Sequence, residues 1–279
     1  MRALVTGAEG QLGRDLCRLL PDASAFGRTA LSVTDRAALA STFSRERPEV
    51  VFNCAADNGV DRAESPDSPA WAVNAEGPGL VAAACARVGA TLVHFSTNYV
   101  FSGEGPRPWT EIDEPSPRSA YARSKLEGER RVFDALPQAL VVRCAGLYGA
   151  GGSAVKGGSF PERILSQART GAPLRVVDDQ RLNPTATADL AAGVLRLVGG
   201  GVEGVVHLAA AGCCSWYEFA AETLRLAGLE VAIDPIPTPP PSPGTAARPG
   251  NGCLESVRVA PLRHWRGGLA AYLGAAEPE

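Results

Sequence analysis

The chain has 279 residues, of which 45% are hydrophobic and 20% charged, and this globular composition excludes a wholly disordered protein. Its 27 Lys and Arg residues against 30 Asp and Glu residues give a net charge of -3, so it has no broad basic field for nucleic acid or an anionic membrane. No uncharged apolar run approaches the ~20 residues that cross a bilayer, and the run before Thr6 is too short for a signal peptide. We therefore expect a soluble, cytoplasmic protein without nucleic-acid or membrane partners.

The cysteines and histidines show no pattern of a metal or redox centre. No two of the 7 cysteines have C-x-x-C spacing, and the 3 histidines are far apart, so we predict no metal site. Most cysteines lie in apolar runs such as residues 51–56, and we expect reduced, buried thiols. A bridge between the neighbours Cys213 and Cys214 would be strained and is not expected.

Short apolar runs alternate with helical patterns through the first half of the chain. Strands are expected at residues 2–6, 23–26, 50–52, 91–95 and 140–142. Helices are expected from the leucines that begin at Leu12, around 81–86 and over 121–136. Continuous apolar strands separated by helices are typical of a parallel sheet covered on both faces. We predict an α/β fold with a doubly wound parallel sheet, a Rossmann fold, whose ligands bind at the carboxyl edge of the strands.

The pattern changes after about residue 149. Residues 149–158 read as a Gly-rich loop, and residues 187–198 as an amphipathic helix that returns to the sheet. Ser215 and Glu218 have the spacing of a capping box, so a helix should begin there. The Pro-rich run 235–243 excludes helix and central strand, and is expected to be an extended surface loop.

These patterns predict two portions. Residues 1–148 should form the dinucleotide-binding Rossmann domain, with 175–200 returning to it. Residues 149–174 and 201–279 should form a smaller C-terminal α/β substrate-binding portion.

The first motif with a chemical meaning runs from Thr6 to Gly13 as T-G-A-E-G-Q-L-G. Glycines at this spacing let the chain turn sharply and approach a pyrophosphate, and the helix that follows offers free N–H groups and a positive dipole end. Its place between the first strand and the first helix predicts a dinucleotide site. The residues expected to bind the cofactor here are Gly7, Gly10, Gln11, Leu12 and Gly13.

The end of the second expected strand bears on the choice of cofactor. An NAD-selective fold usually has an acid there that binds the ribose 2′-hydroxyl. This chain has Gly27 and Arg28 instead, with no carboxylate directly after them. Arg28 favours the 2′-phosphate of NADPH, NADH remains possible, and the alternative is that Arg28 is an ordinary surface arginine.

A second motif joins Tyr121 and Lys125. At this spacing a phenol and an ammonium group share one face of a helix, and a nearby cation lowers the pKa of a phenol. The chain has only two lysines, so the pair is unlikely to arise by chance. Thr97 follows the strand at 91–95 and can point a hydroxyl into the ligand crevice. Thr97, Tyr121 and Lys125 are therefore the predicted catalytic residues.

Taken together, these motifs resemble the extended short-chain dehydrogenases/reductases, and within them the dTDP-4-dehydrorhamnose reductase family. The resemblance runs in order along nearly the whole chain. It rests on T-G-A-E-G-Q-L-G, N-C-A-A-D-N-G-V-D-R-A-E, V-N-A-E-G, F-S-T-N-Y-V-F, Y-A-R-S-K-L-E-G-E, N-P-T, S-W-Y-E-F-A and A-R-P-G-N.

The resemblance implies roles for further residues. Ala55 and Ala56 would lie against the NADPH or NADH cofactor, which Lys125 would also bind. Tyr121 would give the proton to the C4 keto oxygen, which it would hold together with Thr97. The implied substrate-binding residues are Val60, Asp61, Thr97, Tyr99, Tyr121 and Arg248, with Arg248 near the nucleotide diphosphate and Asn74 behind the site.

The implied function is NADPH-dependent reduction of the C4 keto group of a nucleotide-linked 6-deoxysugar, from dTDP-4-dehydro-L-rhamnose to dTDP-L-rhamnose. Two alternatives stay open. One is another dTDP-4-ketohexose reductase of deoxysugar biosynthesis. The other is a non-catalytic, NADP-binding regulatory subunit like the beta subunit of methionine adenosyltransferase. The protein is expected to be a monomer or a homodimer.

Three positions depart from the family pattern. Asn98 stands where the family usually has aspartate, and Gly146 stands where a substrate-packing tryptophan is common. Ser159 replaces an amide side chain. Because the catalytic residues are intact, these departures predict a change in the substrate wall and not in the chemistry.

Overall fold

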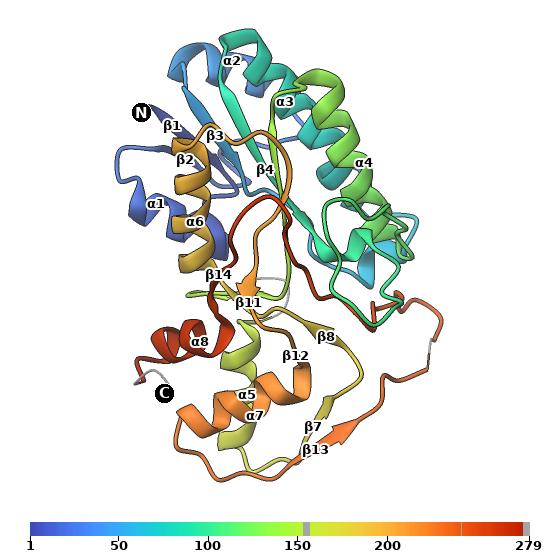
Figure 1. The fold of residues 1–279 in the computed structure, drawn as a ribbon. Helices are drawn as coiled ribbons and strands as arrows, with labels where there is room; N and C mark the ends of the chain where they lie inside the picture. Colours follow the sequence, from blue (N-terminus) through green and yellow to red (C-terminus); the bar gives the residue numbers. More distant parts are fainter. Residues whose placement is uncertain (153–156, 241, 276–279) are drawn as a thin grey trace.

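The computed structural model describes residues 1–152, 157–240 and 242–275. Its centre is a parallel sheet of six strands in the order β10-β5-β4-β3-β1-β2 (Figure 1). The strands are β1 (Ala3–Thr6), β2 (Ser24–Phe26), β3 (Val50–Asn53), β4 (Thr91–Thr97), β5 (Leu140–Cys144) and β10 (Gly204–His207). β1 pairs with both β2 and β3, so the chain changes direction across the sheet at β1. Doubly wound sheets bind ligands in the crevice at such a point.

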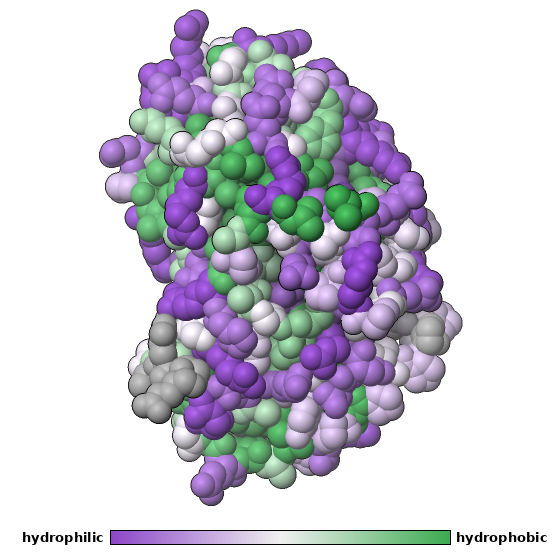
Figure 2. Space-filling view, viewed as in Figure 1, coloured by the Kyte–Doolittle hydropathy of each residue, from purple (hydrophilic) through white to green (hydrophobic). Residues whose placement is uncertain are grey.

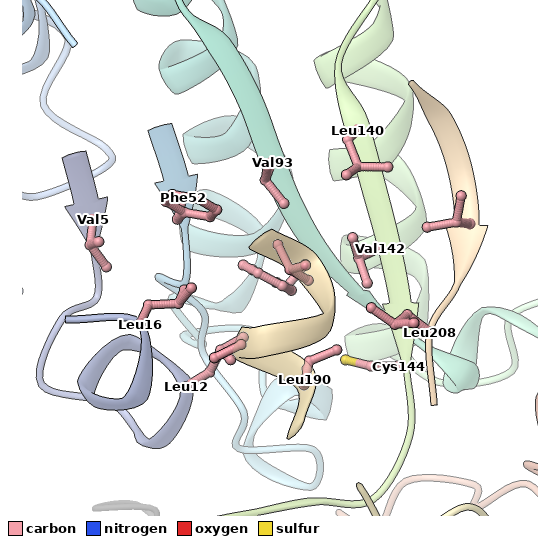
Figure 3. Close-up of a cluster of buried hydrophobic side chains, with 14 of the residues drawn as sticks. Val5, Leu12, Leu16, Phe52, Val93, Leu140, Val142, Cys144, Leu190 and Leu208 are labelled. Carbon is pink, nitrogen blue, oxygen red and sulfur yellow. The ribbon is translucent and has the colours of Figure 1, made fainter. Parts of the chain in front are cut away.

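Helices cover both faces of the sheet, as predicted for continuous apolar strands. The helices on this sheet are α1 (Gln11–Leu19), α2 (Arg36–Glu46), α3 (Gly77–Val88), α4 (Ala120–Ala135) and α6 (Thr187–Gly199). One buried cluster joins alternate strand residues to α1 and α6, where Val5, Phe52 and Val93 face Leu16 and Leu190 (Figure 3). The other strand face packs on α2, α3 and α4. Burial on both faces explains why the strands read as unbroken apolar runs.

The predicted strands of this sheet are confirmed to within two residues at each end. The helix predicted over 121–136 is α4, which begins after Ser119, whose hydroxyl accepts the N–H of Ala122. α2 was not predicted; Asp35 caps it, and it buries only Leu39, Thr42 and Phe43. The sequence gives that helix a narrow apolar stripe, which is a weak signal.

The C-terminal part is smaller and contains short paired strands and three helices. Its helices are α5 (Phe160–Arg169), α7 (Trp216–Leu226) and α8 (Trp265–Leu273). Its strands are β6 (Leu147–Tyr148), β7 (Leu174–Val177), β8 (Arg181–Leu182), β9 (Thr185–Ala186), β11 (Ala210–Ala211), β12 (Cys214–Ser215), β13 (Ile233–Ile236) and β14 (Leu262–His264). The capping box predicted at Ser215 and Glu218 is confirmed. Of the predicted loop 149–158, residues 153–156 lie outside the described residues.

Two predictions about this part need comment. The Pro-rich run contributes Pro235 and Ile236 to β13, which pairs only with β7, so no central strand is formed. Within the range 175–200, α6 packs on the main sheet, while β7 does not join it. The sixth strand of that sheet is β10, later in the chain.

A C-terminal strap, residues 246–254, crosses from the smaller part to the carboxyl edge of the main sheet (Figure 1). A disulfide joins its Cys253 to Cys213. The expectation that all seven cysteines are reduced was wrong for this pair, because the strap brings together residues that are 40 apart in sequence and have no spacing signal. The other five cysteines are free, and Cys213 and Cys214 are not bonded to each other, as predicted.

The surface is mixed in polarity. Figure 2 shows apolar side chains gathered mainly across the upper half of the face in view, with hydrophilic side chains along the top and sides and among the residues below. Within residues 1–152, 157–240 and 242–275, no helix combines the length and apolar character that crossing a bilayer requires.

Candidate active site

The glycine loop between β1 and α1 has no room for a side chain at Gly7 or at Gly13. Gly7 has a φ of +65°, and a Cβ there would lie 2.6 Å from the backbone nitrogen of Ala55. A Cβ at Gly13 would lie 2.7 Å from the Cα of Ala8. The loop after β3 and the start of α1 therefore pack directly on the glycine backbone. Such a cradle lets a pyrophosphate approach the main chain closely.

The electrostatics of α1 agree with an anionic ligand. α1 begins at Gln11 without a side-chain cap and has no acidic residue in its first turn. The first N–H groups of a helix lack intrahelical acceptors, and the N-terminus carries partial positive charge. The buried Gln11 Oε1 has no hydrogen-bond partner among the described residues. The tight backbone at Gly7 and Gly13 and the uncapped start of α1 at Gln11 thus fit a dinucleotide, with Ala55 against Gly7. The other two predicted residues, Gly10 and Leu12, lie in the same turn and helix start.

The three predicted catalytic residues meet at the same sheet edge. Thr97 is the last residue of β4, and Tyr121 and Lys125 lie one turn apart in α4. All three are buried. Lys125 Nζ donates to the carbonyl oxygen of Phe95 at 2.6 Å, which fixes the ammonium group beside β4. The Tyr121 hydroxyl lies 3.5 Å from Asn58 Oδ1.

The pKa of Tyr121 differs from the prediction. Burial raises this pKa well above its usual value, although a hydrogen bond with the Thr97 hydroxyl opposes the rise. The sequence predicted that Lys125 would lower the pKa of Tyr121, but the effect of burial is larger and raises it. Burial lowers the pKa of Lys125 to about 8. At neutral pH the site thus holds a protonated phenol beside a cation that is close to losing its proton.

A network of hydrogen bonds joins α4 to the loop after β3. Asn74, in the π-helix η2 (Ala72–Glu76), accepts the N–H of Asp57 at 2.8 Å and donates to the Asp57 carbonyl oxygen at 2.9 Å. Asn74 also donates to the Ser124 hydroxyl at 3.3 Å, and Ser124 donates to the carbonyl oxygen of Tyr121. The network holds the loop after β3 against the helix turn that carries Tyr121. Asn58 and Ser124 were missed in the sequence, where no spacing links them to Tyr121.

Two of the predicted substrate residues pack directly against Tyr121. Val60 and Tyr99 pack with Tyr121 in one apolar cluster, and the Tyr99 and Tyr121 rings meet edge to face at 5.7 Å. Arg248, on the strap, makes two hydrogen bonds to Asp61, at 2.8 and 2.7 Å. Asp61 and Arg248 were both predicted to bind the substrate, and the structure brings them into direct contact.

Other predicted positions lie at the periphery. Arg28 is exposed and follows the buried Gly27 at the end of β2. Ala56 is half-buried in the loop after β3. Ser159 does not face a ligand, since its hydroxyl caps α5 and contacts Tyr272 at 3.0 Å. Its replacement of an amide therefore has a structural role as a helix cap.

Asn98 ties the strap to the catalytic strand. Its Nδ2 donates to the carbonyl oxygen of Gly252 at 2.8 Å, and its Oδ1 accepts the Thr97 hydroxyl at 3.3 Å. The family that this sequence resembles usually has aspartate here. Its carboxylate would face the carbonyl oxygen of Gly252 and could not donate a hydrogen bond to it. The amide therefore suits this strap, and it is buried.

We expect Asn98→Asp to lower the free energy of unfolding by about 2 kcal/mol at pH 7, because a buried acceptor would be left unpaired. Urea unfolding measures this change. The deficit should shrink as the pH falls towards about 4, where a protonated carboxyl can donate to Gly252. Equal stability of the variant and the wild type at pH 7 would contradict the role given to Asn98.

The sequence profile of the family described as RmlD substrate binding domain matches residues 1–277. The chain belongs to this family. The RmlD-family chain is 42% identical to a dTDP-4-dehydrorhamnose reductase of Streptomyces griseus, over 96% of this chain and 91% of that protein. It is 38% identical to a dTDP-4-keto-6-deoxy-D-glucose reductase of Streptomyces niveus, over 95% of this chain and 93% of that protein.

A solved structure gives the same result for the fold. The dTDP-4-dehydrorhamnose reductase of Bacillus anthracis, in complex with NADP, superposes with a TM-score of 0.92 at 32% identity and 98% coverage of both chains. The family resemblance and the doubly wound fold predicted from the sequence are thereby confirmed.

Proposed function

We propose that this RmlD-family protein is an NADPH-dependent oxidoreductase that reduces the C4 keto group of a nucleotide-linked 6-deoxysugar, converting dTDP-4-dehydro-L-rhamnose to dTDP-L-rhamnose. The observation that carries the proposal is the meeting of Thr97, Tyr121 and Lys125 at the carboxyl edge of the main sheet, the edge that also holds the glycine loop. The S. griseus relative named for this reaction and the NADP complex of the B. anthracis neighbour support it.

The chain's own groups suit the proton transfer. A nicotinamide cofactor, when bound, supplies the hydride. Tyr121 is a neutral phenol at pH 7 and would donate its proton to the keto oxygen, while the Thr97 hydroxyl would hold that oxygen in place. Lys125, anchored by Phe95, would stabilise the phenolate that remains. Because Tyr121 and Lys125 are both buried, little water would reach the phenolate and the ammonium group.

The two portions of the chain would divide the work. We propose that residues 1–148, with 175–200, bind the cofactor, and that 149–174 and 201–279 bind the nucleotide sugar, although β10 lies in the main sheet. Val60 and Tyr99 would pack on the sugar beside Tyr121. Arg248 would contact the nucleotide diphosphate with its guanidinium group oriented by Asp61.

A second candidate is another dTDP-4-ketohexose reductase. Gly146 has no side chain where a substrate-packing tryptophan is common in the family, and the S. niveus relative acts by name on a different keto sugar. The regulatory-subunit alternative is less well supported, because it does not need the buried Thr97, Tyr121 and Lys125 arrangement.

The direct test is consumption of NADPH in the presence of dTDP-4-dehydro-L-rhamnose, with dTDP-L-rhamnose identified as the product. Reduction of only a different dTDP-4-keto sugar would favour the second candidate. Tight NADPH binding without reduction of any such sugar would favour the regulatory subunit and sink the proposal.

The pH dependence should follow Lys125. Its pKa of about 8 means that the ammonium form is lost as the pH rises through 8. We expect kcat/KM to fall above pH 8 in the wild type. Lys125→Arg keeps its charge at every accessible pH, so whatever activity it retains should lack this alkaline limb. A wild-type profile that stays flat from about pH 7 to 9 would contradict the assignment.

A further inference from the structure

The helix that holds Tyr121 and Lys125 also carries a buried carboxylate, Glu129. Arg143 of β5 donates two hydrogen bonds to it, at 3.0 and 2.7 Å, and the two side chains are only 4% and 5% exposed. Because desolvating two charges costs about as much as their attraction contributes, such a pair adds little to the free energy of unfolding. Folding stability therefore does not explain why this ion pair is buried beside the catalytic residues.

The ion pair lies next to the anchor of Lys125. Lys125 and Glu129 are four residues apart in α4, a spacing that puts both on one face of the helix. Lys125 donates to the carbonyl oxygen of Phe95 in β4. Arg143 pairs in register with Ser96, the next residue of that strand. Arg143 thus holds the Glu129 carboxylate on the side of α4 that faces β4 and the ammonium group.

The position of Arg143 is fixed by a second contact. Its guanidinium group lies over the ring of Phe101, 5.2 Å from the ring centre, and this ring stacks on Trp109. These contacts limit the movement of the guanidinium group and of the carboxylate that it binds. A carboxylate fixed near an ammonium group favours the protonated form of the amine.

Several titratable groups around Lys125 are uncharged at neutral and mildly alkaline pH. They are the thiols of Cys54, after β3, and Cys144, in β5, the imidazole of His94, in β4, and the phenol of Tyr121, in α4. Burial raises the pKa of the thiols and of the phenol, and lowers the pKa of the imidazole. None of these four groups is therefore an anion that could stabilise the ammonium group.

Two carboxylates lie closer to the site. Asp57, in the loop after β3, is paired with Arg62 at 2.7 Å, and its charge acts on Tyr121. Burial lowers the pKa of Lys125, and Glu129 opposes this effect together with the two thiols. Since the thiols are uncharged, removing the charge of Glu129 should make the ammonium group easier to deprotonate.

We propose that Glu129 is a positioning residue for the reduction, whose buried carboxylate, held by Arg143, keeps Lys125 in the ammonium form. This inference rests on the proposed function, because it concerns the cation of the same site. Lys125 without its proton could not stabilise the phenolate of Tyr121, so activity at alkaline pH should depend on Glu129.

The test is a direct titration of Lys125 in the full chain. The chain has two lysines, so NMR of protein labelled with carbon-13 at the lysine Cε should show two signals, and Lys125→Arg identifies that of Lys125. Glu129→Gln should lower the pKa of Lys125 by about one unit, the effect of losing one opposite charge nearby. For the keto sugar, kcat/KM should then be nearly unchanged at about pH 6 and about fivefold lower at about pH 8.

Arg143→Met separates the effect of charge from the effect of breaking the ion pair. It removes the cation and leaves the carboxylate, so the pKa of Lys125 should rise. A purely structural role would shift this pKa in the same direction in both variants or leave it unchanged, and either result would overturn the proposal. The double variant Glu129→Gln/Arg143→Met leaves neither charge of the pair unpartnered and covers the case in which a single variant does not fold. Its Lys125 pKa should also lie below that of the wild type.

Glu127→Gln is the matched control. Glu127 is in the same helix and is paired with Arg131 at 2.8 Å, but it is only two residues from Lys125 and so lies on another side of the helix. This variant should leave the pKa and the pH profile unchanged, and an equal shift would overturn the role given to Glu129. If the wild type reduces no dTDP-4-keto sugar, the proposed function fails, while the titration still shows whether Glu129 maintains the charge of Lys125.

Discussion

Replacing Tyr121 with phenylalanine should lower kcat at least ~100-fold, the usual contribution of a positioned proton donor. The phenol hydroxyl is hydrogen-bonded with Thr97 and lies 3.5 Å from Asn58 Oδ1, at the carboxyl edge of the main sheet. Phenylalanine keeps the ring, and therefore the packing on Val60 and Tyr99. The variant should fold and bind NADPH as the wild type does, so the loss should appear in the chemical step.

Two comparisons sharpen this test. Lys125→Ala should lose kcat on the same scale, since it removes the cation that faces the catalytic strand. Tyr272→Phe also removes a tyrosine hydroxyl, one that contacts Ser159 and Glu162 of the smaller part and no predicted catalytic residue, and should keep nearly full activity. A Tyr121→Phe enzyme within a few-fold of the wild type would show that the proton comes from another group.

The residues that the sequence located correctly are those held by local structure. Thr97 ends a strand, the glycine loop joins a strand to a helix, and Tyr121 and Lys125 lie on one helix face. Parallel strands bring their carboxyl ends to one edge, so local positions were enough to predict that these groups meet. The order of the motifs along the chain then identified the family.

What the sequence did not predict is which of the named residues contact one another over long distances along the chain. Arg248 pairs with Asp61 across 187 positions, and Asn98 reaches Gly252 across 154. Nothing in the spacing of these residues predicts where the strap lies. The same strap explains the unexpected disulfide at Cys253. The raised pKa of Tyr121 was missed for a similar reason, because burial depends on everything packed around the phenol.

At Gly146, where the sequence predicts a change in the substrate wall, the side chain of a neighbouring residue takes up the space. Gly146 follows β5, whose Cys144 pairs with Thr97, so it lies just beyond the catalytic edge. It has a φ of +55°, and a Cβ there would lie 2.5 Å from Leu182 Cδ1. The side chain of Leu182, from β8, therefore occupies the place that a side chain at position 146 would need. Leu182 therefore fills part of the space that a tryptophan at position 146 would occupy.

Gly146→Ala should consequently lower the free energy of unfolding by about 3 kcal/mol. A left-handed backbone costs an alanine about 1–2 kcal/mol, and overpacking against Leu182 adds a similar amount. Gly89→Ala is the matched control, because Gly89 has a φ of +72° with nothing within 4 Å of a Cβ. It should show the backbone cost alone. In a Leu182→Ala background, Gly146→Ala should lose the cost of overpacking against Leu182 and keep the backbone cost and the close approach to the Asn183 carbonyl oxygen, at 3.1 Å, a coupling that urea unfolding of the four variants measures.

The same geometry predicts the substrate range. Leucine offers less apolar surface than tryptophan, and the difference removes ~1–3 kcal/mol of contact with the sugar. The wild type should then reduce dTDP-4-dehydro-L-rhamnose and its 2-deoxy analogue with kcat/KM values within about tenfold of each other, while the free keto sugar, lacking the diphosphate for Arg248, should be inactive. Leu182→Ala should bring the first two values closer still. A wild-type preference above ~1000-fold for the rhamnose compound would mean that Leu182 restores the full selectivity of the wall, and that Gly146 does not mark a more permissive site.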